Sequence, residues 1–262
     1  MTTFGDTTPT GRGGLEGAQI APESGYTRIG LPSAVRAGLM PQRLLSVTGF
    51  VLAGGLSRRM GRPKAALVLG DETMLARQVR LLKSVSRSVA VVGRSAGFEG
   101  LEARGTGSAL GGDVRLLPDA LPGHGPLGGI YSGLAWTRTE FNLFLGCDLP
   151  FMETRFLRYL AAKALACGAD VTVPESQDGR LQPLAAVYRR RARAAVKASL
   201  ESGENKVTRF YSRVRCEAVK WPEIARECFP PHIIDNMNTP ADYENAVRRL
   251  PFIHSGPENR GS

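Results

Sequence analysis

The chain has 262 residues, of which 42% are hydrophobic and 22% charged, and its formal net charge is +10. This composition is typical of globular proteins with a substantial buried core. The longest apolar runs, such as 141–147, are far shorter than the roughly 20 residues that cross a bilayer. We therefore do not expect an integral membrane protein.

The basic excess favours small anionic ligands over nucleic acid. Most of the 34 basic residues are arginines, whose planar guanidinium groups make paired hydrogen bonds to phosphates. No dense basic run is interleaved with aromatic residues. The clusters at 189–193 and 248–249 fall in expected helices, where a solvated face is the ordinary arrangement. We therefore expect neither a nucleic-acid nor a membrane partner.

The cysteines indicate a reducing compartment and argue against a zinc site. Cys147, Cys167, Cys216 and Cys228 form no CxxC pair, and only three histidines accompany them. We therefore expect a cytoplasmic location.

Residues 1–43 are expected to form a disordered tail. They carry Gly, Thr, Pro and Ser with few large apolar groups, so folding would bury too little surface to offset its entropy cost. They lack the apolar segment and cleavage site of a secretory signal, and Met40 is a second candidate for the natural start. We expect one domain over 44–252 and a flexible tail over 253–262.

From residue 44 onward, strand-like and helix-like segments alternate. We predict strands at 45–53, 88–92, 114–117, 141–147, 170–173, 184–188 and 216–219. We predict helices at 73–85, 127–136, 153–166, 189–200, 205–211 and 240–250, and a mobile surface insertion at 93–112. The alternation indicates a three-layer, Rossmann-like α/β fold with a mostly parallel sheet and helices on both faces.

A glycine-rich loop directly follows the first predicted strand. Residues 52–65 read LAGGLSRRMGRPKA, at the place where α/β sheets bind ligands. Glycines allow backbone N–H groups to approach phosphate oxygens, a hydroxyl adds a donor, and basic side chains neutralise charge on a leaving pyrophosphate. The candidate residues are Gly54, Gly55, Ser57, Arg59 and Lys64.

This loop differs from both common phosphate motifs. It is neither GxGxxG nor GxxxxGK[ST], so a dinucleotide fold and a P-loop both fit poorly. A glycine-rich turn with surface arginines is the alternative explanation. The whole string, however, closely resembles the LAGGxSxRMGxxKA signature of nucleotidyltransferases with a GT-A-like fold.

A second motif ends the strand predicted at 141–147. Residues 142–151 read NLFLGCDLPF, which places Asp148 at a strand end, a favoured position for a Mg²⁺ ligand beside a phosphate chain. The alternative is that Asp148 caps the helix expected to begin near Glu153. We interpret the neighbouring Cys147 as a small core residue without a chemical role.

Three further segments narrow the choice of substrate. Residues 119–130 read DALPGHGPLGGI, 180–184 read RLQPL, and 236–240 read NMNTP. Together with the two motifs above, they resemble the molybdenum cofactor guanylyltransferase family over residues 47–250. Locally, 238–240 is also an ordinary helix start, and His124 is expected to face solvent.

The resemblance implies a GTP site, a magnesium ion and a molybdopterin acceptor. On the nucleotide side it implies Leu52, Ala53, Gly54, Lys64 and Asp119, with Asp148 holding Mg²⁺ and the phosphates. On the acceptor side the corresponding candidates are Arg180, Gln182, Asn236 and Asn238. It also suggests enzymes that deliver molybdopterin or accept the finished cofactor as partners.

One departure from the family pattern leaves the identity of the nucleotide base undecided. The family often has an asparagine after its second strand, whereas residues 91–95 read VVGRS. Since base choice rests on a few hydrogen bonds, a cytidylyltransferase, or a related transferase to another small phosphate, is the nearest alternative. A nucleotide-binding protein without turnover and a nucleic-acid-binding role based on the positive charge are the others.

Overall fold

The computed structural model describes residues 44–54, 63–93, 110 and 113–254. These residues contain a seven-stranded sheet with the strand order β5-β4-β1-β6-β8-β7-β9. The strands are β1 Leu44–Leu52, β4 Ser86–Gly93, β5 Arg115–Pro118, β6 Phe141–Gly146, β7 Val171–Pro174, β8 Ala185–Arg189 and β9 Cys216–Val219. Only β8 runs antiparallel to its neighbours within this sheet, so the prediction of a mostly parallel sheet is confirmed.

The helices also follow the expected order. They are η1 Lys64–Ala66, α2 Met74–Lys83, α5 Gly125–Trp136, α6 Thr154–Cys167, η2 Arg190–Ala192, α7 Arg193–Glu201, η3 Val207–Arg213, α8 Trp221–Arg226 and α9 Pro240–His254. The sequence did not indicate η1, α8 or the hairpin of β2 Val68–Leu69 and β3 Glu72–Thr73. The predicted insertion at 93–112 and the tail at 1–43 lie mostly or wholly outside the described residues.

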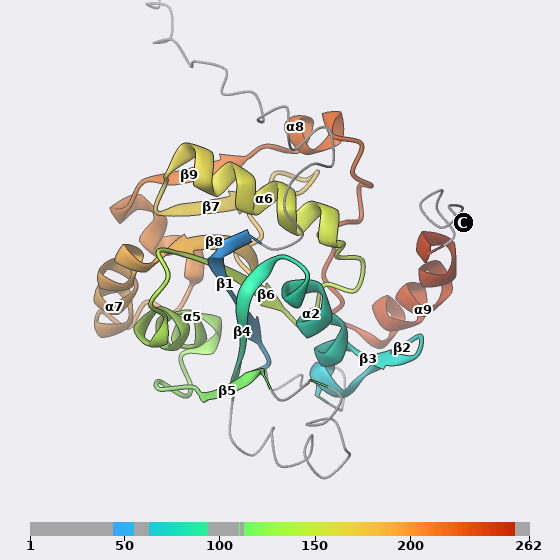
Figure 1. The fold of residues 1–262 in the computed structure, drawn as a ribbon, viewed down its shortest axis with the longest axis horizontal. Helices are drawn as coiled ribbons and strands as arrows, with labels where there is room; N and C mark the ends of the chain where they lie inside the picture. Colours follow the sequence, from blue (N-terminus) through green and yellow to red (C-terminus); the bar gives the residue numbers. More distant parts are fainter. Residues whose placement is uncertain (1–43, 55–62, 94–109, 111–112, 255–262) are drawn as a thin grey trace, which may run out of the picture. The chain divides into compact units, whose positions relative to one another are not determined.

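Two helical layers cover the sheet because successive strand residues point to opposite faces. Val47 and Val51 of β1 pack in a cluster with α2 and α6, whereas Phe50 packs with α5 and α7. Figure 1 shows α2 and α6 along one face of the sheet, with α5 and α7 along the other. The predicted three-layer architecture is therefore confirmed.

A smaller third cluster joins the β2–β3 hairpin to α9. Leu67, Leu69 and Met74 pack there against Met237 and Ala246. In Figure 1 the hairpin and α9 lie side by side, and the Tyr243 hydroxyl donates to the Val68 carbonyl at 2.7 Å. This packing brings the end of the described chain close to the segment that follows the glycine-rich loop. In the part of the chain that the structure describes, no helix has the length and apolarity needed to cross a membrane.

Candidate active site

The two main motifs leave adjacent strands at the same edge of the sheet. Leu52 at the end of β1 pairs with Gly146 at the end of β6. Ala53 and Gly54 therefore emerge beside Asp148. The sheet has β4 on one side of β1 and β6 on the other, so the chain changes direction here. Open α/β sheets bind ligands in the crevice at such a point.

Lys64 lies between the two halves of this edge. Its Nζ donates to Asn238 Oδ1 at 2.7 Å and lies 3.7 Å from Asp148 Oδ2. The side chains of Lys64 and Asp148 are each 18% exposed, so this ion pair is only partly screened by solvent. One ammonium group thus contacts a residue of the expected nucleotide side and one of the expected acceptor side.

Asp148 keeps one carboxylate oxygen without a partner. Oδ1 is buried and has no hydrogen-bond partner among the described residues. Burial raises the pKa of Asp148 above its ordinary value, and the charge of Lys64 opposes that shift. The residue at the N-cap of α6 is Glu153, so the alternative in which Asp148 caps this helix is wrong. The carboxylate is instead available at the strand end.

The donor set around Asp148 fits a magnesium ion that arrives with its substrate. Within the described ranges, no three His, Cys, Asp or Glu side chains gather into a metal-binding cluster. Mg²⁺ is usually held by one or two carboxylates, with phosphates and water completing the shell. A lone carboxylate with a buried, unpaired oxygen matches that pattern. Asp148 is the residue that would hold the ion.

Two cavities meet at Asp148 and Leu184. The smaller, about 190 Å³, lies on the glycine-loop side, and the larger, about 950 Å³, lies on the α9 side. Besides the two shared residues, the smaller cavity is lined by Leu52, Ala53, Gly54, Lys64, Ala65, Pro126, Gly146 and Cys147. The larger cavity contains all four predicted acceptor residues, which are Arg180, Gln182, Asn236 and Asn238.

The acceptor candidates differ in how tightly they are held. The Asn236 amide donates to Gln182 Oε1 at 3.1 Å, which joins two segments that are distant in sequence. Arg180 is 82% exposed and pairs with Asp178 at 3.1 Å, so it lies at the rim. Gln182 and Asn236 therefore form one preorganised pair, while among the described residues the Arg180 side chain contacts only Asp178 through a hydrogen bond or ion pair.

The segment at 238–240 forms the start of α9, as one of its two interpretations predicted. The Asp242 carboxylate accepts from the backbone N–H groups of Asn238 and Thr239, and Thr239 Oγ1 accepts from the Asp242 N–H. This reciprocal arrangement is a capping box for α9. The cap uses only the backbone of Asn238, which leaves its side chain to contact Lys64.

Several sequence candidates are placed elsewhere or cannot be placed. Asp119 lies beside the end of β4, where its carboxylate accepts from Leu121 N–H at 3.0 Å and Ser132 Oγ at 3.1 Å. It lines neither of the two cavities. His124 contacts Asn205, with 2.8 Å between Nδ1 and Oδ1. The predicted ligands Gly55, Ser57 and Arg59 lie outside the described residues.

Cys147 is a core residue, as the sequence suggested. It is 6% exposed, and burial raises the pKa of its thiol far above the ordinary value. A thiol in that state is a poor nucleophile.

Three residues were not predicted from the sequence. One lines the site, and two lie in the core beside it. Leu184 lines both cavities but carries no chemical signature. Arg77 and Gln78 are buried in α2 and hydrogen-bond to the segment after Asp148. A signal for Gln78 existed, because it occupies a core position within the apolar stripe of Leu75 and Val79.

Comparisons with known proteins identify the family of the chain. Residues 49–217 match the family described as the MobA-like NTP transferase domain. The chain belongs to this family. It is therefore a nucleotidyltransferase, and the likeness stated from the motifs is confirmed at the family level.

Individual members of the MobA-like family and its structural neighbours show how far the likeness extends. A protein of Pelotomaculum thermopropionicum, named "Probable molybdenum cofactor guanylyltransferase", is 36% identical over 203 residues, covering 78% of this chain and 93% of the relative. The molybdopterin-guanine dinucleotide biosynthesis protein A of Archaeoglobus fulgidus has a TM-score of 0.67 at 20% identity, covering 78% and 99% of the two chains. The 4-diphosphocytidyl-2C-methyl-D-erythritol synthase of Anaerococcus prevotii has a TM-score of 0.59 at 12% identity, covering 79% and 96%. At such identities the two structures establish the fold alone, and this GT-A-like fold serves differently named enzymes.

Proposed function

We propose that this enzyme transfers GMP from GTP to molybdopterin, releasing pyrophosphate and forming the guanine dinucleotide form of the molybdenum cofactor. The observation that carries the proposal is the position of Lys64 Nζ, 2.7 Å from Asn238 Oδ1 and 3.7 Å from Asp148 Oδ2, where the two cavities meet. The 36% identity to a relative named for guanylyl transfer supports GTP over CTP. The free cysteines support a cytoplasmic location.

On this proposal the smaller cavity receives the nucleotide and the larger one the acceptor. Backbone N–H groups at 53–55 approach the phosphates, with Ser57 and Arg59 adding donors and charge. Leu52 lines the smaller cavity. Asp119 lines neither cavity, so its contact with the nucleotide stays a prediction from the family resemblance. Asn236, Asn238, Gln182 and Arg180 contact molybdopterin. The two substrates then meet over Lys64 and Asp148.

In the proposed reaction, a terminal phosphate oxygen of molybdopterin attacks the α-phosphorus of GTP. The new P–O bond forms as the bond to the bridging oxygen of the β-phosphate breaks, and that electron pair leaves with pyrophosphate. The attacking phosphate is already anionic near neutral pH, so no general base is needed. Lys64 neutralises charge that builds on the phosphates, and both cavities orient the reactants. Bound Mg²⁺ would supply further charge neutralisation at Asp148.

The test is pyrophosphate release from GTP, CTP, ATP and UTP, each with Mg²⁺ and molybdopterin. We expect release with GTP and its loss in Lys64→Ala and Asp148→Asn. Lys220→Ala is the matched control, because Lys220 pairs with Glu175 at 2.7 Å and lines neither cavity. Release with CTP instead would reverse the base assignment. No release with any nucleotide would mean a binding role or a different acceptor.

A further inference from the structure

Helix α2 directs two consecutive polar side chains into the core. Arg77 is 3% exposed and Gln78 is completely buried, although both lie among the apolar residues of this helix. Burying a guanidinium group or an amide costs free energy unless hydrogen bonds replace those lost to water. Gln78 Oε1 has no hydrogen-bond partner among the described residues, so the partners of the nitrogen donors indicate why the helix tolerates these side chains.

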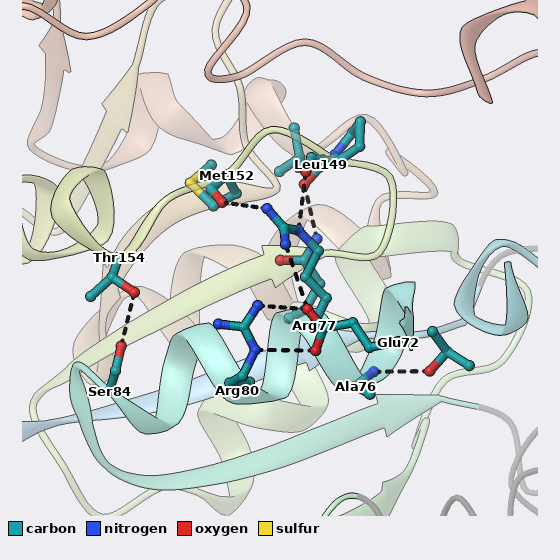
Figure 2. A network of polar contacts seen from close by, with 11 residues as sticks. Glu72, Ala76, Arg77, Arg80, Ser84, Leu149, Met152 and Thr154 are labelled. Carbon is teal, nitrogen blue, oxygen red and sulfur yellow. Dashed lines mark hydrogen bonds and ion pairs between the residues drawn. The ribbon is translucent and has the colours of Figure 1, made fainter. Parts of the chain in front are cut away.

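Those partners are backbone carbonyl groups of a single short segment. Arg77 Nε donates to Pro150 O at 3.1 Å, and its Nη2 donates to Met152 O at 3.5 Å. Gln78 Nε2 donates to Leu149 O at 2.9 Å. Figure 2 shows Arg77 extending from α2 toward the loop that follows β6, where Leu149 and Met152 lie. One helical turn thus fixes three carbonyl groups of the loop 149–152.

This loop begins directly after Asp148. The carbonyl of Asp148 itself accepts from Met237 N–H at 2.7 Å, so the segment is held from two sides. Its carboxylate lies close to the backbone of Gly146, because a Cβ built on that glycine would lie 2.5 Å from Asp148 Oδ1. Hydrogen bonds therefore hold the backbone at Asp148 and in the loop that follows it.

The guanidinium of Arg77 is itself oriented by Glu72. Arg77 Nη1 lies 3.5 Å from Glu72 Oε1, and Arg80 donates to both oxygens of the same carboxylate at 3.1 and 2.5 Å (Figure 2). Burial acts to raise the pKa of Glu72, but Arg80 and Arg77 hold it below its ordinary value. Glu72 therefore stays ionised, and Arg77 keeps one orientation.

We propose that Arg77 and Gln78 are positioning residues that hold Asp148 for the metal and the nucleotide. The inference rests on the proposed function, in which Asp148 binds Mg²⁺. A buried carboxylate oxygen without a partner is costly, so a mobile loop would rotate it toward solvent or a donor. The hydrogen bonds from α2 prevent that relaxation and keep Oδ1 available.

The test compares two variants of one helix. Gln78→Met keeps the size and burial of the side chain but removes the donor to Leu149. Lys83→Met places the same residue on the same helix but removes contacts to the Leu110 carbonyl and Asp113, away from Glu72 and the loop 149–152. We measure Mn²⁺ binding, as a substitute for Mg²⁺, by electron paramagnetic resonance with a nonhydrolysable GTP analogue, and thermal unfolding of each variant. We expect Gln78→Met to weaken Mn²⁺ binding about tenfold, and Lys83→Met to leave it unchanged, with both variants folded.

Asp148→Asn separates this inference from the proposed function. If Asp148→Asn weakens Mn²⁺ binding while folded Gln78→Met binds like native protein, the positioning role is refuted and the metal role of Asp148 stands. If Asp148→Asn itself binds like native protein, both are refuted. Arg77→Lys gives a second test. Lysine keeps the positive charge but lacks the planar guanidinium group, so we expect a Mn²⁺ affinity between those of native protein and Gln78→Met.

Discussion

A buried polar side chain lies near each end of β6, and the two differ in whether all of their polar atoms are hydrogen-bonded. At the start of the strand, Asn142 is completely buried and fully hydrogen-bonded. Its Oδ1 lies 2.7 Å from Thr137 Oγ1 and 2.9 Å from Thr139 Oγ1, and its Nδ2 faces three backbone carbonyls. Just beyond the other end, Asp148 keeps a buried oxygen without a partner among the described residues.

The difference separates a structural polar group from one held ready for a ligand. A satisfied buried amide stabilises the fold, because its removal leaves its partners unpaired. An unsatisfied buried carboxylate lowers stability and remains only where the surroundings fix it. The amino end of β6 is therefore expected to matter for folding, and the carboxyl end for activity.

The largest expected effect is the slower release of pyrophosphate by the Asp148→Asn variant. We expect pyrophosphate release to fall about 10²- to 10³-fold, because the charge that faces the metal and phosphates is lost. The free energy of unfolding should not fall. Initial rates and urea denaturation check both expectations. A variant that is destabilised while its folded fraction keeps full activity would reverse the comparison.

Asn142→Leu, at the other end of the strand, is expected to have the opposite effect, on stability and not on activity. Leucine fills a similar volume but leaves Thr137, Thr139 and the Tyr188 carbonyl without their partner. We expect the free energy of unfolding to fall by about 2 kcal/mol, with an unchanged rate per folded molecule. Urea denaturation and active-site titration separate the two quantities. An equally stable but inactive protein would contradict the assignment.

Gly146→Ala tests how narrowly the carboxylate is placed. The new methyl group would lie 2.5 Å from Asp148 Oδ1 and 3.1 Å from Leu184 Cβ, so the carboxylate must move. We expect the release rate to fall about tenfold, equivalent to about 1.4 kcal/mol, measured at saturating GTP. A rate equal to that of native protein would show that this position need not be fixed.

The smallest expected effect is the pH dependence of stability at Asp148. Because the folded-state pKa lies above its ordinary value of 3.8, the contribution of Asp148 to stability is fully present below pH 3.8 and is lost as pH rises through the folded pKa. Asp148→Asn should therefore be more stable than native protein near neutral pH. That difference should shrink as the pH falls toward 3.8. Urea midpoints across this range provide the measurement, and a difference independent of pH would argue against the raised pKa.

The sequence by itself determined the layers and the principal motifs. Strand and helix periodicities are local properties of the chain, so the segments at 45–53, 73–85 and 141–147 were placed within a few residues of β1, α2 and β6. The glycine-rich loop and Asp148 were identified because each directly follows a strand. The hairpin β2–β3 was missed, because its two-residue strands are too short to show a period.

Only the tertiary structure decided which of these residues meet. Lys64 contacts Asn238 because the hairpin β2–β3 packs against α9, a contact between distant parts of the chain that no local pattern encodes. The unpaired oxygen of Asp148 and its support by Arg77 and Gln78 likewise depend on how α2 packs over β1 and β4, from where it reaches the loop after β6. Periodicity specifies which face of an element is buried, whereas the partners of a buried polar atom are set by packing between elements.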